Sequence, residues 1–547
     1  MKAFLMHSDR DFDPGQLLAR REKELRYNKD DGDANLNLQQ VLPWNGDALT
    51  QDLGLNVLFN AMAQGDRYLF EVAKVAALSS LTDPVAIRYR QRALADSLKN
   101  AQIIEAMYRI AIDAIEGEKK GYWSFFTRYP SGILHRAVDV LQMFVGALKR
   151  LRDVADQHAD KFESEAFSRL FAMLREELGD EYFATIDEHL RRLKFRHGIL
   201  ISARLGKGSK GDGYVLRKPH EDARNWLTRM LADKPVSYSY ALHPRDEAGA
   251  RALSELSDKG VNLVANALAQ STDHILSFFQ MLRTELAFYV GCINLYSRLS
   301  GMGEPICFPV AAPVGERKLS FSGLYDPSLA LSLGRKVVGN DLDADRMDLL
   351  IITGANTGGK STFLRSVGLA QLMLQAGMFV AADAFSSAVC AGLCTHYRRE
   401  EDTTMESGKW DEELKRVSEI IGRIGSNTML LFNESFASTD EREGSEIAEQ
   451  IVAALLERGV KVLFVTHLYE FAHRFHRRHV DGALFLRAER RPDGARTYRL
   501  VDGEPLQTSY GKDLYDSVFG SARPRRLSDS ATGARLQRRG RSTLIQG

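Results

Sequence analysis

Residues 354–361 read Gly-Ala-Asn-Thr-Gly-Gly-Lys-Ser, which matches the phosphate-binding pattern G-x-x-x-x-G-K-[ST] at every position. The apolar run at 349–352 predicts a buried strand before this loop, and an apolar-periodic stretch that ends near Gly377 predicts a helix after it. In such a loop, backbone N–H groups turn toward the phosphates of a nucleotide. Lys360 is then expected to reach the β- and γ-phosphates, and Ser361 to hold Mg²⁺. The alternative is a glycine-rich turn before a helix.

Length and composition limit the possible classes of protein. At 547 residues the chain is expected to hold more than one domain, because single cores stop growing near ~250–300 residues. The formal net charge of +1 predicts no general attraction to nucleic acid, so a DNA-binding surface must be a local patch. Four cysteines in this length do not suggest a disulfide framework. No secretory signal and no apolar run of ~18 residues is evident, so we expect a cytoplasmic protein without a membrane span.

The sequence pattern divides the chain near residue 305. Residues 1–49 are interpreted as an N-terminal extension, and residues 50–304 predict helices almost throughout. Residues 305–520 predict strands alternating with helices, which is typical of an α/β domain with a parallel sheet covered on both faces. Residues 521–547 hold seven arginines and one acid, so they predict a disordered basic tail that either binds nucleic acid weakly or only aids solubility.

Two details of the helical part can be predicted. Residues 53–62 carry apolar side chains at helical spacing and are one example of the helical pattern. Strand-like runs near 199–205 and 214–218 flank a loop rich in glycine and lysine, which predicts a β-hairpin near 199–218. The cations of this loop either contact phosphate or form an ordinary solvated turn.

A second strand, predicted at 429–432, ends in the candidates for hydrolysis. In phosphate-loop ATPases, an acid at this place binds Mg²⁺ through water and a following Glu polarises the attacking water. Here Asn433 stands where an Asp is expected, and Glu434 fits the base. The side-chain oxygen of Asn433 can still accept a hydrogen bond from a metal-bound water, but it lacks the negative charge of an Asp. The sequence therefore does not fix the rate of hydrolysis. His467 follows the next predicted strand, where a His can contact the γ-phosphate.

Several of these segments resemble the MutS mismatch-repair ATPases, an ABC-type group. Residues 354–362 are similar to the G-P-N-M-G-G-K-S-T loop of that family. Other segments match in order along the chain: Asn340-Asp341, Ser407-Gly408-Lys409, Ser438-Thr439, Thr466-His467-Leu468-Tyr469-Glu470 and Ser509-Tyr510-Gly511. Residues 66–91 resemble the core and lever helices that join the ATPase to DNA in that family. The resemblance spans about residues 50–520.

The resemblance implies a composite site for ATP and Mg²⁺. Glu434 and His467 are the implied catalytic residues, and Ser361 and Asn433 the implied Mg²⁺ ligands, Asn433 through water. The implied nucleotide contacts are Asn340, Gly354, Ala355, Asn356, Thr357, Gly358, Gly359, Lys360, Ser361 and Thr362. In this family Ser407, Ser438 and Thr439 would act across a dimer on the nucleotide of the opposite subunit.

The resemblance also implies DNA as the partner, bound by a homodimer with no membrane association. The expected function is ATP-dependent DNA binding in mismatch repair or a related recognition of DNA structure, in the cytoplasm with the nucleoid. Mismatch sensors carry a Phe-x-Glu motif in a domain ahead of the helical core, and helical sequence already begins by about residue 50 here, so we expect a short form without that domain. Double-stranded, mismatched or branched DNA all remain candidates. The alternative is a nucleotide-gated protein-interaction module with little DNA binding and slow or no hydrolysis.

Overall fold

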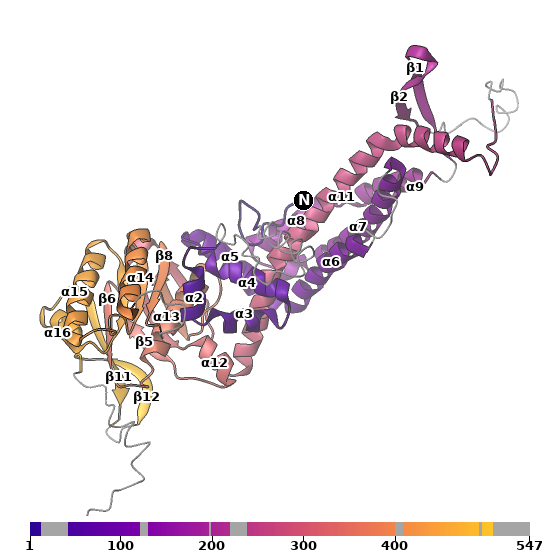
Figure 1. Cartoon of the computed structure of the whole chain (residues 1–547). Coiled ribbons are helices and arrows are strands. Elements are labelled where there is room, and N and C mark those ends of the chain that lie inside the picture. Colours follow the sequence, from indigo (N-terminus) through magenta and orange to yellow (C-terminus); the bar gives the residue numbers. More distant parts are fainter. Residues whose placement is uncertain are drawn as a thin grey trace, which may run out of the picture.

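A computed structural model describes residues 1–12, 42–120, 129–195, 198–218, 238–399, 408–491 and 495–506. Figure 1 shows an α/β part at one end of the molecule, coloured orange and yellow, and a helical arm that extends away from it. A small β-hairpin lies at the far tip of this arm (Figure 1). The first residues of the chain lie between the two ends, beside α8 and α11.

Long helices form the arm. They are α6 (Ala101–Lys120), α7 (Pro130–His158) and α11 (Glu247–Gly301). At 55 residues, α11 is about 80 Å long. Its C-terminal half is buried on several sides, with Phe278, Phe279 and Leu282 in the core. At the tip, β1 (Ile201–Leu205) and β2 (Gly211–Leu216) pair antiparallel.

Shorter helices lie at the base of the arm and along its length (Figure 1). They are α2 (Gly46–Asp52), α3 (Leu55–Ala63), α4 (Arg67–Leu78), α5 (Pro84–Lys99), α8 (Glu165–Glu177) and α9 (Asp180–Leu193). The helical pattern predicted over 53–62 is confirmed from Leu55 onward, and α3 begins there because Gly54 adopts a left-handed conformation (φ 63°) that separates α2 from α3. Asp66 and Asp83 accept hydrogen bonds from the first turns of α4 and α5, so both starts follow ordinary capping chemistry.

The central sheet of the α/β part has the strand order β12-β11-β6-β10-β9-β8. Its strands are β6 (Leu349–Gly354), β8 (Gly392–Tyr397), β9 (Thr428–Asn433), β10 (Lys461–Val465), β11 (Ala483–Arg490) and β12 (Arg496–Asp502). All neighbours pair in parallel except β11 and β12. The predicted α/β class with a parallel-rich sheet is therefore confirmed.

Helices cover both faces of this sheet, because successive side chains of a strand point to opposite sides. Leu350 and Ile352 of β6 belong to the same core cluster as the apolar face of α13 (Lys360–Gln375). Leu349 and Ile351 belong to a second cluster, formed with α14 (Lys409–Arg423), α15 (Glu441–Glu457) and α16 (Tyr469–Arg477). Burial on both faces explains why β6 is a continuous apolar run.

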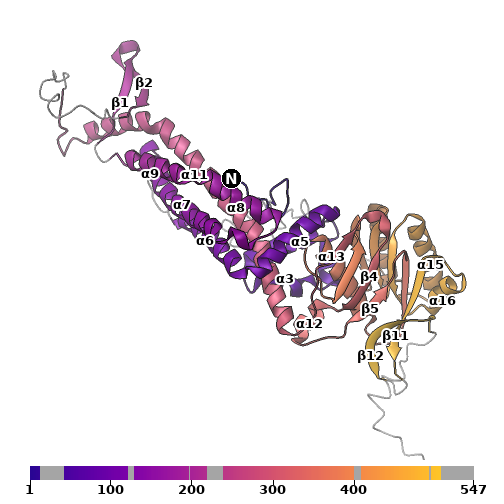
Figure 2. The same cartoon turned by 180° about the vertical axis from the view of Figure 1, so that it is seen from behind.

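A second sheet departs from the predicted alternation of strands and helices. It has the order β3-β7-β4-β5, formed by β3 (Val310–Ala312), β4 (Leu319–Leu324), β5 (Asn340–Asp343) and β7 (Ala384–Ala388). Most of its pairing is antiparallel, and the short helix α12 (Pro327–Leu333) lies between β4 and β5 in the chain. Burial alternates along β5, as it does in a sheet with one solvated face. Figure 2 shows this sheet beside α13.

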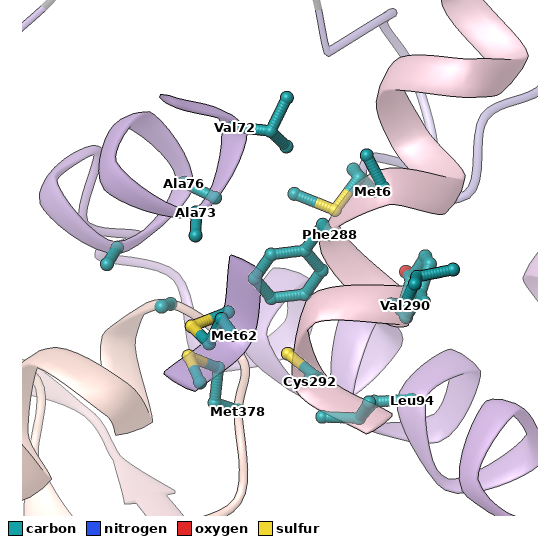
Figure 3. Close-up of a cluster of buried hydrophobic side chains, with 14 of the residues drawn as sticks. Met6, Met62, Val72, Ala73, Ala76, Leu94, Phe288, Val290, Cys292 and Met378 are labelled. Carbon is teal, nitrogen blue, oxygen red and sulfur yellow. The ribbon is translucent and has the colours of Figure 1, made fainter. Parts of the chain in front are cut away.

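The helical and α/β parts share one hydrophobic core at the base of the arm. Figure 3 shows how Phe288 and Cys292 of α11 gather with Met62 of α3 and with Met378, which follows α13. Met6, from the first twelve residues, joins the same cluster (Figure 3). The sequence interpretation of residues 1–49 as an extension gives no hint of this, because the first residues lack helical or strand periodicity.

Arg90 of α5 connects three segments inside this core. Its guanidinium is almost completely buried and donates hydrogen bonds to the carbonyl oxygens of Met6 (3.1 Å) and Ala376 (3.0 Å). Burial lowers the pKa of Arg90 to about 10, which still leaves it charged at neutral pH. Ala376 caps the C-terminus of α13, so the charge also faces the negative end of that helix.

We expect Arg90→Ala to destabilise the fold, because two buried carbonyl groups lose their donor. Each such loss typically costs about 1–3 kcal/mol. Urea unfolding followed by circular dichroism would measure the change, with Arg88→Ala as the control because Arg88 is exposed on the same helix. Equal midpoints for the two variants would contradict this role of Arg90.

Candidate functional site

The glycine-rich loop joins β6 to α13 and lies close to β11. Gly354 and Gly359 have φ values of 105° and 92°, in the region that favours glycine, and Thr357 also has a positive φ of 56°. A Cβ on Gly358 would lie 2.6 Å from the Cβ of Ala488 and 2.8 Å from the carbonyl oxygen of Ala355. The glycines therefore serve the turn and its close approach to the neighbouring strand.

Lys360 is the first residue of α13, and its side chain lies under the loop. It is only 5% exposed, and its ammonium donates hydrogen bonds to the carbonyl oxygens of Gly354 and Ala355, both at 3.0 Å. Burial lowers the pKa of Lys360 to about 8, while the nearby charge of Glu434 opposes this shift. A buried cation bound by neutral carbonyls is stabilised by any anion that reaches it. This environment fits a phosphate group.

Ser361 and Asn433 are brought together across the edge of the sheet. The hydroxyl of Ser361 donates to the side-chain oxygen of Asn433 at 2.8 Å. The two residues are 72 positions apart in sequence, and they meet because β6 and β9 both flank β10 and end at the same edge. Two neighbouring oxygens at this position fit a hydrated Mg²⁺, which keeps several waters and phosphate oxygens as ligands.

Glu434 and His467 form a second pair at this edge. Nε2 of His467 lies 3.4 Å from Oε1 of Glu434. The hydrogen bond from His467 is the largest cause that lowers the pKa of Glu434, and the charges of Lys360 and Arg398 act in the same direction against burial. Glu434 also has a positive φ of 54°, in a turn that follows β9 directly. An ionised carboxylate held in an unusual backbone conformation is typical of a functional position.

The glycine-rich loop and the Glu434–His467 pair line one cavity of about 900 Å³. Asn356, Thr357, Lys360, Ser361, Thr362, Glu434 and His467 all line it. Its walls also include residues that the sequence analysis did not single out: Arg335, Lys336, Arg398 and Tyr498, together with the apolar side chains of Leu329, Leu333 and Val338. A lining that combines cations with apolar side chains suits a phosphorylated ligand with an aromatic base. No sequence pattern marks these residues, because they come from separate loops and strands.

Asn340 lies in the wall of the same cavity, and its amide already makes two hydrogen bonds to the backbone. Its oxygen accepts a hydrogen bond from the backbone N–H of Leu500 at 2.8 Å, and its nitrogen donates to the carbonyl oxygen of Tyr498 at 3.3 Å. The amide thus joins β5 to β12 and holds the two sheets together. A contact with the base or ribose remains a proposal that has to coexist with these bonds.

Ser438 and Thr439, which are expected to act across a dimer, do not line this cavity within the chain. Ser438 lines a different cavity, and the hydroxyl of Thr439 donates to Glu443 at 2.7 Å. Ser407 and the segment 509–511 lie outside the described residues. Placement away from the same chain's loop is what a trans role requires, although it does not test that role.

The described residues contain neither a cluster of metal-binding side chains nor a membrane-spanning helix. Among them no three His, Cys, Asp or Glu side chains gather in a way that could hold a metal ion. None of the helices that the structure describes combines the length and apolar character needed to cross a membrane.

Comparison with known proteins agrees with this fold. Residues 82–302 match the family model for the MutS2 N-terminal domain, and residues 350–519 match that for MutS domain V. The chain therefore belongs to the MutS-related ABC-type ATPases. Within that group, its helical part is similar to MutS2 in particular.

Relatives named Endonuclease MutS2 show the same similarity. The protein from Thermus thermophilus is 26% identical over 339 residues, which cover 59% of this chain and 42% of that protein. The protein from Shouchella clausii is 34% identical over 173 residues, which cover 31% of this chain and 22% of that protein. The chain thus spans less than half the length of these relatives.

The geometry of Glu434 leads to a prediction about turnover. We expect Glu434→Gln to keep nucleotide binding, because the loop is untouched, and to slow hydrolysis by about 10²–10⁴-fold, the usual contribution of a general base. Single-turnover ATP hydrolysis would measure the rate, and equilibrium binding of labelled ATP would measure affinity. Glu457→Gln, an exposed change on α15, is the control. An unchanged rate would show that Glu434 is not the base.

Proposed function

We propose that this protein binds and hydrolyses Mg·ATP and uses it to control binding to DNA. The observation that carries the proposal is the convergence of Lys360, Ser361, Glu434 and His467 in one cavity from three different strand ends, with Asn433 hydrogen-bonded to Ser361. These groups have the chemistry that phosphoryl transfer requires, which is mostly positioning and charge stabilisation. The relationship to MutS ATPases supports the same activity.

Each residue of the cavity would have a separate role. Lys360 and the N–H groups of the loop would bind the β- and γ-phosphates, and the buried position of Lys360 would strengthen the attraction. Ser361, and Asn433 through water, would hold Mg²⁺, which when bound neutralises developing charge on the phosphates. Glu434 would accept a proton from the attacking water, and His467 would keep that carboxylate oriented and ionised.

DNA is proposed to bind near the tip of the arm. Five exposed cations lie on the β1–β2 hairpin or next to it: Arg204, Lys207, Lys210, Arg217 and Lys218. With a chain net charge of only +1, such a local group is the kind of patch that DNA binding needs. Two arms in a homodimer would enclose a duplex, and the recognised structure is proposed to be mismatched or branched DNA. Such a protein would work with the nucleoid in the cytoplasm.

The coupling of nucleotide to DNA has a physical route in the shared core. Phe288 of α11 packs with Met378, which follows α13, and the loop begins α13 at its other end. A shift of α13 on nucleotide binding would therefore act on the base of the arm. Because α11 is one continuous helix up to the hairpin, a small rotation at its base would move the tip by a larger distance.

The DNA patch can be tested by salt dependence. We expect the double change Lys207→Gln and Lys210→Gln to weaken binding to homoduplex, mismatched and branched DNA alike. The slope of log K against log[salt] should fall by about one for each phosphate that a removed lysine had neutralised. Fluorescence anisotropy with and without ATP would measure both, and Arg109→Gln with Lys149→Gln on the arm is the control of equal charge. An unchanged slope would exclude the hairpin, and no DNA affinity at all would favour a protein-interaction module.

Assembly can be tested by mixing two inactive chains. One phosphate loop and one candidate trans segment per chain mean that a complete site needs two chains in a two-fold dimer. Lys360→Ala and a chain changed at Ser407 and Ser438 should each lose ATPase activity. Mixed heterodimers should recover part of it, because one of their two composite sites is intact. Verified heterodimers without activity would rule out shared sites, and full activity of Lys360→Ala alone would overturn the loop assignment.

A further inference from the structure

A second large cavity lies outside the proposed nucleotide site. It has a volume of about 890 Å³ and is bounded by α2, β8 and α14. Arg398 lines this cavity and the nucleotide cavity alike, so the two are neighbours. His396 and Glu413 line this cavity, and neither belongs to a sequence motif or has a role proposed above.

The cavity wall is rich in cations. Arg398, Arg399, Lys409, Arg416 and Arg423 line it, against the acids Glu412, Glu413 and Glu419. Arg399 also pairs with buried Asp52 of α2 at 2.9 Å. Burial, and then the charge of Arg399, lower the pKa of Arg416. Neighbouring guanidinium groups in a partly buried wall are stabilised when an anion binds between them.

The charges of Arg416 and Arg399 also affect the pKa of the buried His396. It is almost completely buried, and its Nδ1 lies 2.7 Å from the hydroxyl of Ser435. Burial is the first cause that lowers its pKa to about 3, and the charges of Arg416 and Arg399 follow. His396 is therefore neutral at physiological pH and adds no charge, so the arginines remain the groups that an anion would meet.

Glu413 supplies a buried acceptor at the floor of the cavity. It is 3% exposed, and its Oε1 accepts a hydrogen bond from the backbone N–H of Phe436 at 2.6 Å. Its Oε2 is buried and has no hydrogen-bond partner within the described part of the chain. A buried carboxylate oxygen without a donor is costly, and an N–H or O–H group of a ligand would remove that cost.

We propose that this cavity binds a small phosphorylated ligand that also carries N–H or O–H donors, such as a nucleotide or a sugar phosphate. Arg399, Arg416 and Lys409 would bind the phosphate, and Oε2 of Glu413 would accept from the donor. The volume falls within the range of small-molecule sites, and Glu413, whose Oε2 is buried without a partner, is one of the lining residues. Trp44, 45% exposed with the Arg423 guanidinium 5.0 Å from its ring centre, offers an aromatic wall at the cavity.

A ligand here would also affect ATP hydrolysis, and this part rests on the proposed function. Ser438 lines the cavity and lies four residues after Glu434, in the segment proposed to act across the dimer. The backbone N–H of Arg398 donates to the carbonyl oxygen of Asn433 at 3.0 Å. A ligand that contacts Arg398 or Ser438 would therefore touch residues that are bonded to, or close in the chain to, the groups proposed to bind Mg²⁺ and to activate water.

Calorimetric titration of the full chain tests the site directly. The background is Lys360→Ala, which weakens phosphate binding at the first cavity, and the probes are pyrophosphate, ribose 5-phosphate and GMP. We expect saturable binding with one ligand per chain, weakened at least tenfold by Arg416→Gln. Lys415→Gln, the adjacent residue on α14 and not part of the cavity wall, is the matched control and should bind normally. Lys409→Gln is the second variant if Arg416→Gln unfolds.

The choice of probe distinguishes phosphate binding by the cations from the hydrogen bond that a ligand would donate to Glu413. Glu413→Gln keeps an oxygen for the N–H of Phe436, so it should weaken GMP or ribose 5-phosphate and leave pyrophosphate unchanged. No binding of any probe, or equal loss with Lys415→Gln, would overturn the proposal. It would also be overturned if Arg416→Gln altered only the dimerisation constant, because the cavity would then be an interface between two copies. These results do not depend on ATP hydrolysis, whose failure would show separately in the parent chain.

Discussion

The buried ammonium of Lys360 is the constraint on which the arrangement of the α/β part depends. An amine in this position must find acceptors, and it finds them in the carbonyl groups of Gly354 and Ala355. This requires β6 to end at the loop and α13 to begin at the lysine. It also requires the loop to pack against β11, whose Ala488 leaves no room for a side chain at position 358. The same charge also helps keep Glu434 ionised.

The second constraint is the core that joins the two parts of the molecule. Arg90 bonds the first residues of the chain to the C-terminus of α13, while Phe288 of α11 packs into the same cluster. Buried interiors are close-packed, so a displacement at one side is transmitted rather than absorbed. A nucleotide-dependent motion of α13 and a movement of the arm would therefore share these side chains.

Much of the α/β architecture can be predicted because its signals are local. The buried run before the loop, the capping of α15 by Asp440 and the left-handed Gly459 after it all follow from short stretches of sequence. The break at Gly54 escapes prediction because a single glycine within an apolar-periodic run is compatible with either a helix or a turn. The antiparallel sheet around β4 escapes it because strand direction depends on which distant segment supplies the partner.

The chemical groups and their order along the chain follow from the sequence alone: the glycines, Lys360 and Ser361 of the loop, and the pair Asn433-Glu434. Which groups meet in space follows from the fold, which brings Ser361 to Asn433 and His467 to Glu434, and places Arg399, Arg416 and Glu413 around a second cavity. The physical reason is that a motif is set by backbone geometry over a few residues. A contact between strand ends depends on sheet order, which the packing of the whole core selects.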